Sequence, residues 1–348
     1  MSGPVASLGA AWTERVAAAV GRVAGTRGAV LCFHGFDVDG APSPSSMHVP
    51  LALLEAIVAT IRGLGSLVPL DDLVIRYRAG RSTAGLVALT SDDAYASLLG
   101  TEPFLRREKV PLTVFAVSDA LVRGRAFWWD RIDESAPRSS PERWRRFEDA
   151  CGLPDTYRVG QPPGEGPARP LRQWVLSEHA GRWPAKAEPV LDRLEEDLGW
   201  RTGQRSMTEP ELEGFLARTG AQLAVHTVSH AALPFLSDAE LVDEVGRCHE
   251  ALGARFRDVL PYLAIPFGLF DARTLRLAAK AGMLMSLTLA GSPLDRPFDA
   301  EVGMPRLCVV REHTPGIVAL KASGVAGLLG WVRGRSTTPY PVLPSPTT

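Results

Sequence analysis

Two adjacent carboxylates and two histidines supply the residue types from which a hydrolytic metal site can be built. Asp92 and Asp93 directly follow a short run of β-formers at 86–89, and His226 and His230 have His-x-x-x-His spacing. Two imidazoles and one carboxylate suit Zn²⁺ or a similar divalent ion, with one coordination position left for water. We therefore predict a metal site formed by Asp93, His226 and His230, beside which a second carboxylate can take a proton from water.

The carboxylate pair also has an interpretation without chemistry. Asp is a favoured helix N-cap, and a helix is predicted at 94–106, directly after Asp92 and Asp93. A second pair, Asp71 and Asp72, is interpreted as a cap only. The remaining histidines that lack such partners are assigned to surfaces or helix faces: His48, His179, His249 and His313.

Apolar runs that alternate with helical patterns must position these residues. Strands are predicted at 28–33, 67–70, 86–89, 111–117, 221–225, 261–265, 284–289 and 307–310. Seven or eight strands, each followed by a helix, predict an α/β fold of the triosephosphate isomerase type, in which active sites lie past the carboxyl ends of the strands. His34, the Asp92–Asp93 pair, His226 and Phe267 each follow a predicted strand. The fold therefore brings all of them to one face.

Three segments are predicted along the chain. Residues 1–25 read as an N-terminal amphipathic helix, residues 26–333 as the barrel, and residues 334–348 as a disordered tail rich in Pro, Ser and Thr. The repeat is interrupted at 135–205 by a polar, Trp-containing stretch, which is interpreted as a mostly helical insertion. Its helical signals are at 141–151, 170–180 and 185–199.

Composition describes an ordinary globular chain with no membrane or nucleic-acid signature. The 348 residues are 45% hydrophobic, and the net charge of −1 gives no steering toward nucleic acid. No run approaches the roughly 18 apolar residues of a membrane span, and residues 5–24 do not resemble a secretory signal. The four cysteines are scattered and form no Cys-x-x-Cys pair, so we expect reduced thiols and a cytoplasmic protein.

Five motifs resemble those of one enzyme family, the polysaccharide deacetylases with the NodB homology domain (carbohydrate esterase family four). Thr90-Ser91-Asp92-Asp93-Ala94-Tyr95 resembles the family's Thr-Phe-Asp-Asp-Gly-Tyr, and residues 226–230 match its His-[Ser/Thr]-x-x-His. Residues 264–268 resemble its Ala-Tyr-Pro-Phe-Gly motif. Stretches 128–131 and 304–307 resemble sequences common in one branch. The similarity runs from about residue 28 to 312.

The resemblance implies a distorted (β/α)7 barrel and a metal-dependent hydrolysis of an acetamide, commonly on an N-acetylated sugar. The resemblance implies that Asp92 is the general base and that Asp93, His226 and His230 are the ligands of a divalent metal, for which zinc is expected. The backbone N–H of Phe267 would hold the oxyanion. A cytoplasmic enzyme would meet carbohydrate substrates that are soluble, lipid-linked or nucleotide-linked.

The chain departs from the family pattern at several positions. Ser91 stands where Phe is usual, and Ala94 where Gly is usual, so a positive φ at position 94 would strain the turn. Ala264 replaces an Arg that supports the base in many members. The late Leu-His motif, whose His protonates the leaving amine, has no clear counterpart, because Lys321 stands there. His34, at the end of the first strand, is a candidate substitute acid or a partner for Asp92.

These departures leave other functions open. A deacetylase-like barrel that binds a carbohydrate or a partner without turnover is favoured by Ser91, Ala94 and the missing acid. A third interpretation keeps the fold and changes the amide, as in a ring-opening amidohydrolase. The retained ligand set and Asp92 favour the deacetylase.

Overall fold

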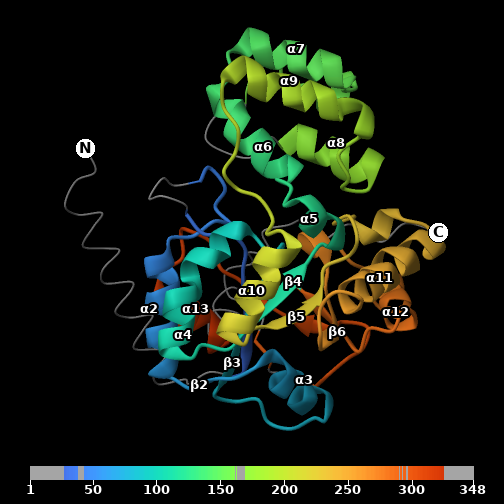
Figure 1. Cartoon of the computed structure of the whole chain (residues 1–348). Coiled ribbons are helices and arrows are strands. Elements are labelled where there is room, and N and C mark those ends of the chain that lie inside the picture. Colours follow the sequence, from blue (N-terminus) through green and yellow to red (C-terminus); the bar gives the residue numbers. More distant parts are fainter. Residues whose placement is uncertain are drawn as a thin grey trace.

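Nine strands of the computed structural model form one sheet that wraps into a barrel (Figure 1). The structure describes residues 27–37, 43–160, 162, 169–289, 291, 293–294 and 297–324. The sheet order is β8-β7-β6-β5-β4-β3-β1-β9, with β2 paired to β3, and every pair is parallel. The strands are β1 (Ala29–Phe33), β2 (Ser66–Leu67), β3 (Leu86–Ser91), β4 (Leu112–Ala116), β5 (Gln222–Val225), β6 (Val259–Ala264), β7 (Met285–Thr288), β8 (Met304–Pro305) and β9 (Leu307–Cys308).

The two edges of the sheet are joined by one short segment of chain. β8 pairs with β7, β9 pairs with β1, and Arg306 is the single residue between them. The backbone of Arg306 also donates to Thr288 O, at 2.8 Å. The barrel is thus nearly closed by residues 304–308, and the predicted distorted (β/α)7 barrel is confirmed.

Helices cover the outside of this barrel. They are α2 (Leu51–Arg62), α3 (Leu70–Arg78), α4 (Glu102–Glu108), α5 (Ser118–Arg123), α10 (Glu209–Thr219), α11 (Asp238–Gly253), α12 (Ala272–Lys280) and α13 (Pro315–Ala322). Both α10 and α11 begin with a complete capping box, from Thr208 and Glu211 and from Ser237 and Glu240. In Figure 1, α2, α4 and α13 lie on one side of the barrel and α11 and α12 on the other.

A separate helical group occupies the stretch interpreted as an insertion, and it lies above the barrel in Figure 1. It contains α6 (Trp128–Ser135), α7 (Pro141–Cys151), α8 (Arg169–His179) and α9 (Glu188–Leu198). Trp144 and Trp174 are buried in its own apolar cluster, against which Trp183 packs. These three Trp residues therefore pack helices together, and the pocket described below takes its tryptophan from α6 instead.

Neither carboxylate pair caps a helix, so the interpretation of these pairs as N-caps was wrong. Asp92 and Asp93 lie in a turn, and the helix that follows is a 3₁₀ turn, Ala96–Thr101, with Tyr95 at its N-cap and no side-chain cap. Asp71 and Asp72 lie inside the first turn of α3. The strand predicted at 67–70 is only Ser66–Leu67 in the structure, because Leu70 already begins α3.

Some predicted segments lie outside the described residues. These are the N-terminal helix within 1–25 and the tail 334–348. Among the helices of the described chain, none combines the length and the apolar character needed to cross a membrane.

Candidate active site

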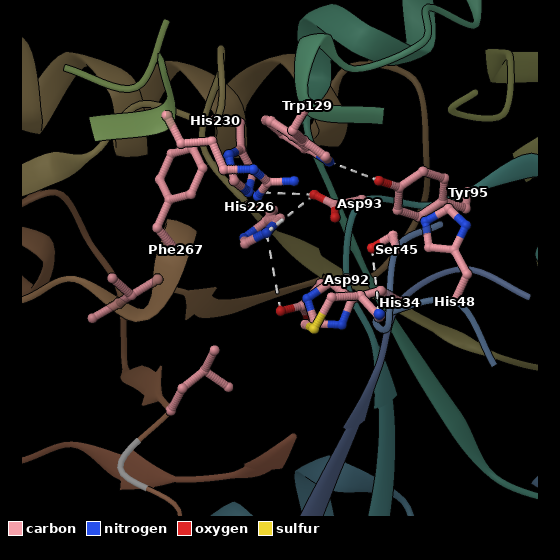
Figure 2. A pocket seen from close by; sticks show the side chains of 14 residues that line it. His34, Ser45, His48, Asp92, Asp93, Tyr95, Trp129, His226, His230 and Phe267 are labelled. Carbon is pink, nitrogen blue, oxygen red and sulfur yellow. Dashed lines mark hydrogen bonds and ion pairs between the residues drawn. The ribbon is translucent and has the colours of Figure 1, made fainter. Parts of the chain in front are cut away.

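Three predicted ligands converge at the carboxyl ends of β3 and β5. Oδ1 of Asp93 lies 3.4 Å from Nε2 of His226 and 3.4 Å from Nε2 of His230, and all three side chains are buried. Figure 2 shows both imidazoles turned toward this carboxylate. The sequence spacing alone did not fix this geometry, because the segment 226–230 is a loop and not a helix.

These side chains fit a tetrahedral divalent ion. An ion with ligand bonds of about 2.0–2.1 Å holds neighbouring ligand atoms about 3.3–3.4 Å apart, which is the distance from Asp93 Oδ1 to each imidazole nitrogen. The same distance is long for a hydrogen bond, and Asp93 Oδ1 has no hydrogen-bond partner within the described part of the chain. A buried, orphaned carboxylate oxygen between two imidazole nitrogens indicates a cation site.

Neighbouring groups hold both imidazoles in place. Nδ1 of His226 lies 2.8 Å from the carbonyl oxygen of Ala264, which directs Nε2 toward Asp93. The ring of His230 packs between Trp129 and Phe267, with centroid distances of 4.6 and 4.5 Å. Burial lowers the pKa of His230 to about 3, so the imidazole is neutral, as a ligand must be.

The loop between the histidines is anchored from outside the pocket. The backbone N–H and the hydroxyl of Ser229 donate to the carboxylate of Glu244, at 3.0 and 2.7 Å. Arg182 donates to the same carboxylate and to the Ser229 hydroxyl. Ser229 thus positions the His loop. The Thr227 hydroxyl, by contrast, has no hydrogen-bond partner among the described residues.

Asp92 is held by Arg306, an arginine that was not predicted as a site residue. Arg306, fully buried, donates from Nη1 to Oδ1 at 2.7 Å and from Nη2 to Oδ2 at 2.8 Å. Burial alone would raise the pKa of Asp92, but the guanidinium outweighs it and holds that pKa well below its usual range. Arg306 therefore supplies the support that Ala264 cannot give. In the sequence, Arg306 was marked only as part of the stretch 304–307, which resembles sequences common in one branch of the family.

The turns that aim these side chains contain residues with left-handed backbones. Asp93, Ala94, Thr227, His230 and Phe267 have φ values of 69°, 49°, 70°, 57° and 57°. Such conformations cost of order 1–3 kcal/mol each in non-glycine residues and cluster at functional sites. The positive φ expected at position 94 is therefore present in the chain, and Ala adopts it.

One pocket contains this constellation. Besides the ligands and Asp92, its lining includes His34, His48, Tyr95, Trp129, Arg172 and Phe267. His34, directly after β1, faces the same carboxylates, and its pKa is raised to about 9: burial opposes this, but contact with Cys308 and the charges of Asp92 and Asp93 outweigh it. The structure thus brings every predicted site residue to one pocket.

His48 also lies in the pocket, and its assignment to a surface or helix face was wrong. It is 1% exposed, and Nε2 lies 3.4 Å from Oδ1 of Asp130. Asp130 in turn accepts from the Tyr95 hydroxyl at 2.6 Å, and Trp129 Nε1 donates to that hydroxyl at 3.0 Å (Figure 2). Burial lowers the pKa of His48 to about 3. This neutral imidazole can hydrogen-bond a bound molecule, and its Nδ1 has no partner in the described structure.

The comparison with family models finds one match. Residues 183–286 match the model of the family described as "Polysaccharide deacetylase". The matched region contains both histidines and Phe267, whereas Asp92 and Asp93 lie outside it. Among curated proteins, none matches the chain. The family resemblance that the motifs predicted is thereby confirmed.

Solved structures of similar fold cover most of the chain. IcaB from Ammonifex degensii is 16% identical, with a TM-score of 0.53 over 86% of this chain and 98% of its own. Deacetylase PplD from Streptococcus pyogenes, solved with acetate, is 12% identical, with a TM-score of 0.51 over 86% and 99%. The putative polysaccharide deacetylase BA0330 from Bacillus anthracis is 13% identical, with a TM-score of 0.52 over 86% and 69%. At these identities the likeness establishes the fold.

Proposed function

We propose that this chain is a metal-dependent deacetylase of an N-acetylated sugar or glycan intermediate. The premise is its likeness over residues 183–286 to the polysaccharide deacetylases, which are hydrolases of carbon–nitrogen bonds of amides. One observation carries the proposal. Oδ1 of Asp93 lies 3.4 Å from Nε2 of His226 and of His230, which is the ligand spacing of a tetrahedral ion, and Asp92 lines the same pocket. The ion assigned to this site is Zn²⁺ or a similar divalent metal.

The residues divide the reaction between them. A divalent ion bound there would lower the pKa of its water from about 15.7 toward 7 and polarise the acyl oxygen. Asp92, kept ionised and oriented by Arg306, accepts the proton of the attacking water. The N–H of Phe267, at the end of β6, is proposed to stabilise the oxyanion.

His34 is proposed as the acid for the leaving amine. A group with a pKa of about 9 carries a proton at neutral pH, and His34 lines the same pocket as Asp92. His48 is unsuited to this step, because burial keeps its imidazole neutral. Its expected role is to bind a hydroxyl or amide of the substrate. The proposed substrate is a carbohydrate, free or carried on a lipid or nucleotide.

The strained turn does not favour the non-catalytic alternative. Ala94 was expected to disturb the turn that aims the two carboxylates, yet it adopts φ 49° and both carboxylates face the pocket. A barrel that only bound sugars would have no use for a buried base held by a bidentate arginine. Binding of sugars without turnover is therefore one of the outcomes that the next experiment distinguishes.

Acetate release tests the proposal. Purified protein, supplied with Zn²⁺, is incubated with oligomers of N-acetylglucosamine and with UDP-N-acetylglucosamine, and acetate is measured enzymatically. Asp92→Asn is expected to abolish release, because the amide cannot accept the proton. Asp72→Asn, at an exposed position in α3, is the matched control and should leave release unchanged. Undiminished release by Asp92→Asn would refute the assigned base, and binding of these sugars without release would favour the non-catalytic barrel.

A further inference from the structure

Two cysteines meet where the barrel closes. Cys32 in β1 and Cys308 in β9 are direct register partners of a parallel strand pair. Neighbouring strands lie about 4.8 Å apart, which is within the Cα separation of about 4.4–6.8 Å that a disulfide requires. Side chains of register partners leave the sheet on the same face, so the two thiols lie close enough to influence each other's pKa.

The pair lies directly beneath the catalytic groups. Sγ of Cys32 donates to Oδ2 of Asp92 at 3.5 Å. Sγ of Cys308 contacts the His34 side chain and lies 3.9 Å from Sδ of Met47. His34 and Met47 both line the pocket, so Cys308 is one side chain away from it. The proposed hydrolysis uses neither thiol.

We propose that Cys32 and Cys308 form a reversible disulfide when the protein meets a hydroperoxide, which makes this pair an oxidative modification site beside the base. The Cys308 thiolate attacks the peroxide, forming an S–O bond and breaking the O–O bond, and the released hydroxide leaves as water. Cys32 then attacks the Cys308 sulfur, forming the S–S bond and expelling the second oxygen as water. Two thiols and one hydroperoxide thus give one disulfide, and the peroxide takes up the two electrons.

The environments of the two thiols suit this order of events. Contact with Cys32, opposed by burial and aided by the His34 imidazole, lowers the pKa of Cys308 to about 5. Burial raises the pKa of the fully buried Cys32. Cys308 is also the more exposed of the two residues. The thiolate in the less buried residue therefore reacts first, and the thiol of Cys32 resolves the product.

The disulfide would change the surroundings of Asp92. It removes the thiol that donates to Oδ2 and fixes β1 to β9, two residues beyond Arg306. We expect oxidised protein to lose turnover and dithiothreitol to restore it. This consequence rests on the proposed deacetylase function, whereas the disulfide itself does not, because peptide mapping detects it without a substrate.

The experiment treats the full chain with hydrogen peroxide, alkylates the remaining thiols, and maps the peptides by mass spectrometry before and after dithiothreitol. The expected product links the peptides that contain Cys32 and Cys308, while Cys151 and Cys248, both buried and free, are alkylated once the protein is unfolded. The Cys32→Ser variant should instead give a sulfenic acid at position 308 that dimedone traps.

Several results would overturn the inference. The disulfide is refuted if both thiols remain alkylatable after peroxide, or if the cross-link involves Cys151 or Cys248 instead. A linked pair with unchanged acetate release would refute the effect on turnover. Absence of acetate release from the reduced protein as well would instead count against the proposed function, so the two failures are separable.

Discussion

Replacing Arg306 by Met tests the buried pair that holds the base. The substitution keeps an unbranched side chain but removes both hydrogen bonds to Asp92, which is 2% exposed. Removing one partner of a buried ion pair costs about 3–5 kcal/mol, because the remaining charge is left without compensation. We expect a loss of this size in the free energy of unfolding at pH 8, measured by urea denaturation of metal-free protein with tryptophan fluorescence.

The loss should depend on pH in a defined direction. In the native chain the folded pKa of Asp92 lies below its unfolded value of about 3.9, so its stabilising contribution is present above about pH 4 and disappears only as pH falls through the folded pKa. In Arg306→Met, burial without the guanidinium raises that pKa above the unfolded value. The variant therefore loses stability as pH rises. The difference between the two proteins should be largest at pH 8 and smallest near pH 4.

Two further variants isolate the pair. The double variant Asp92→Asn with Arg306→Met removes both charges and should be more stable than either single variant. Arg311 makes a comparable bidentate contact with Asp37, at 2.8 and 2.7 Å, but is 24% exposed on its side chain. Arg311→Met should therefore cost about 1 kcal/mol. Equal losses for both arginines, or a loss at Arg306 that does not change with pH, would refute the reasoning.

Three other predictions concern the turn, the pocket wall and the metal. Ala94→Gly should raise the free energy of unfolding by up to about 1 kcal/mol, because the backbone φ of Ala94 is 49°. The control Ala254→Gly, at φ −72°, should lower the free energy of unfolding by about 0.5–1 kcal/mol. Urea denaturation of both variants distinguishes backbone strain from a general effect of glycine. Gly35→Ala should destabilise the protein by about 1–3 kcal/mol, since the new Cβ would lie 2.9 Å from the His48 ring, and adding His48→Ala should recover part of this loss. Zn²⁺ at 100 times its dissociation constant should stabilise the native protein by about 2.7 kcal/mol in thermal unfolding; the same shift in His230→Ala would contradict the assigned site.

The sequence was sufficient for those parts of the site that follow strands with a strong local signal. Asp92, Asp93 and His226 come directly after apolar runs, and parallel strands in a barrel bring their carboxyl ends to one face. The same reasoning placed His34 and Phe267 in the pocket that the structure contains. Local pattern and global fold agree at these positions.

Other parts of the site depend on contacts that no local pattern encodes. Arg306 reaches Asp92 only because two strands of two residues each close the barrel around it, and such strands are too short to give a periodic signal. His48 lies in a turn after β1 and meets Asp130 of α6, an element of the helical group above the barrel. A lone histidine without a neighbouring ligand carries no sign of such a partner.

The metal content of the purified protein tests the central claim most directly. Inductively coupled plasma mass spectrometry should find about one divalent ion per chain in the native protein and none in Asp93→Ala or His226→Ala, because each variant removes one of the three converging ligand atoms. Circular dichroism confirms that the variants remain folded. A native protein that contains no ion and takes up no added Zn²⁺, or variants that retain a full equivalent, would contradict the account.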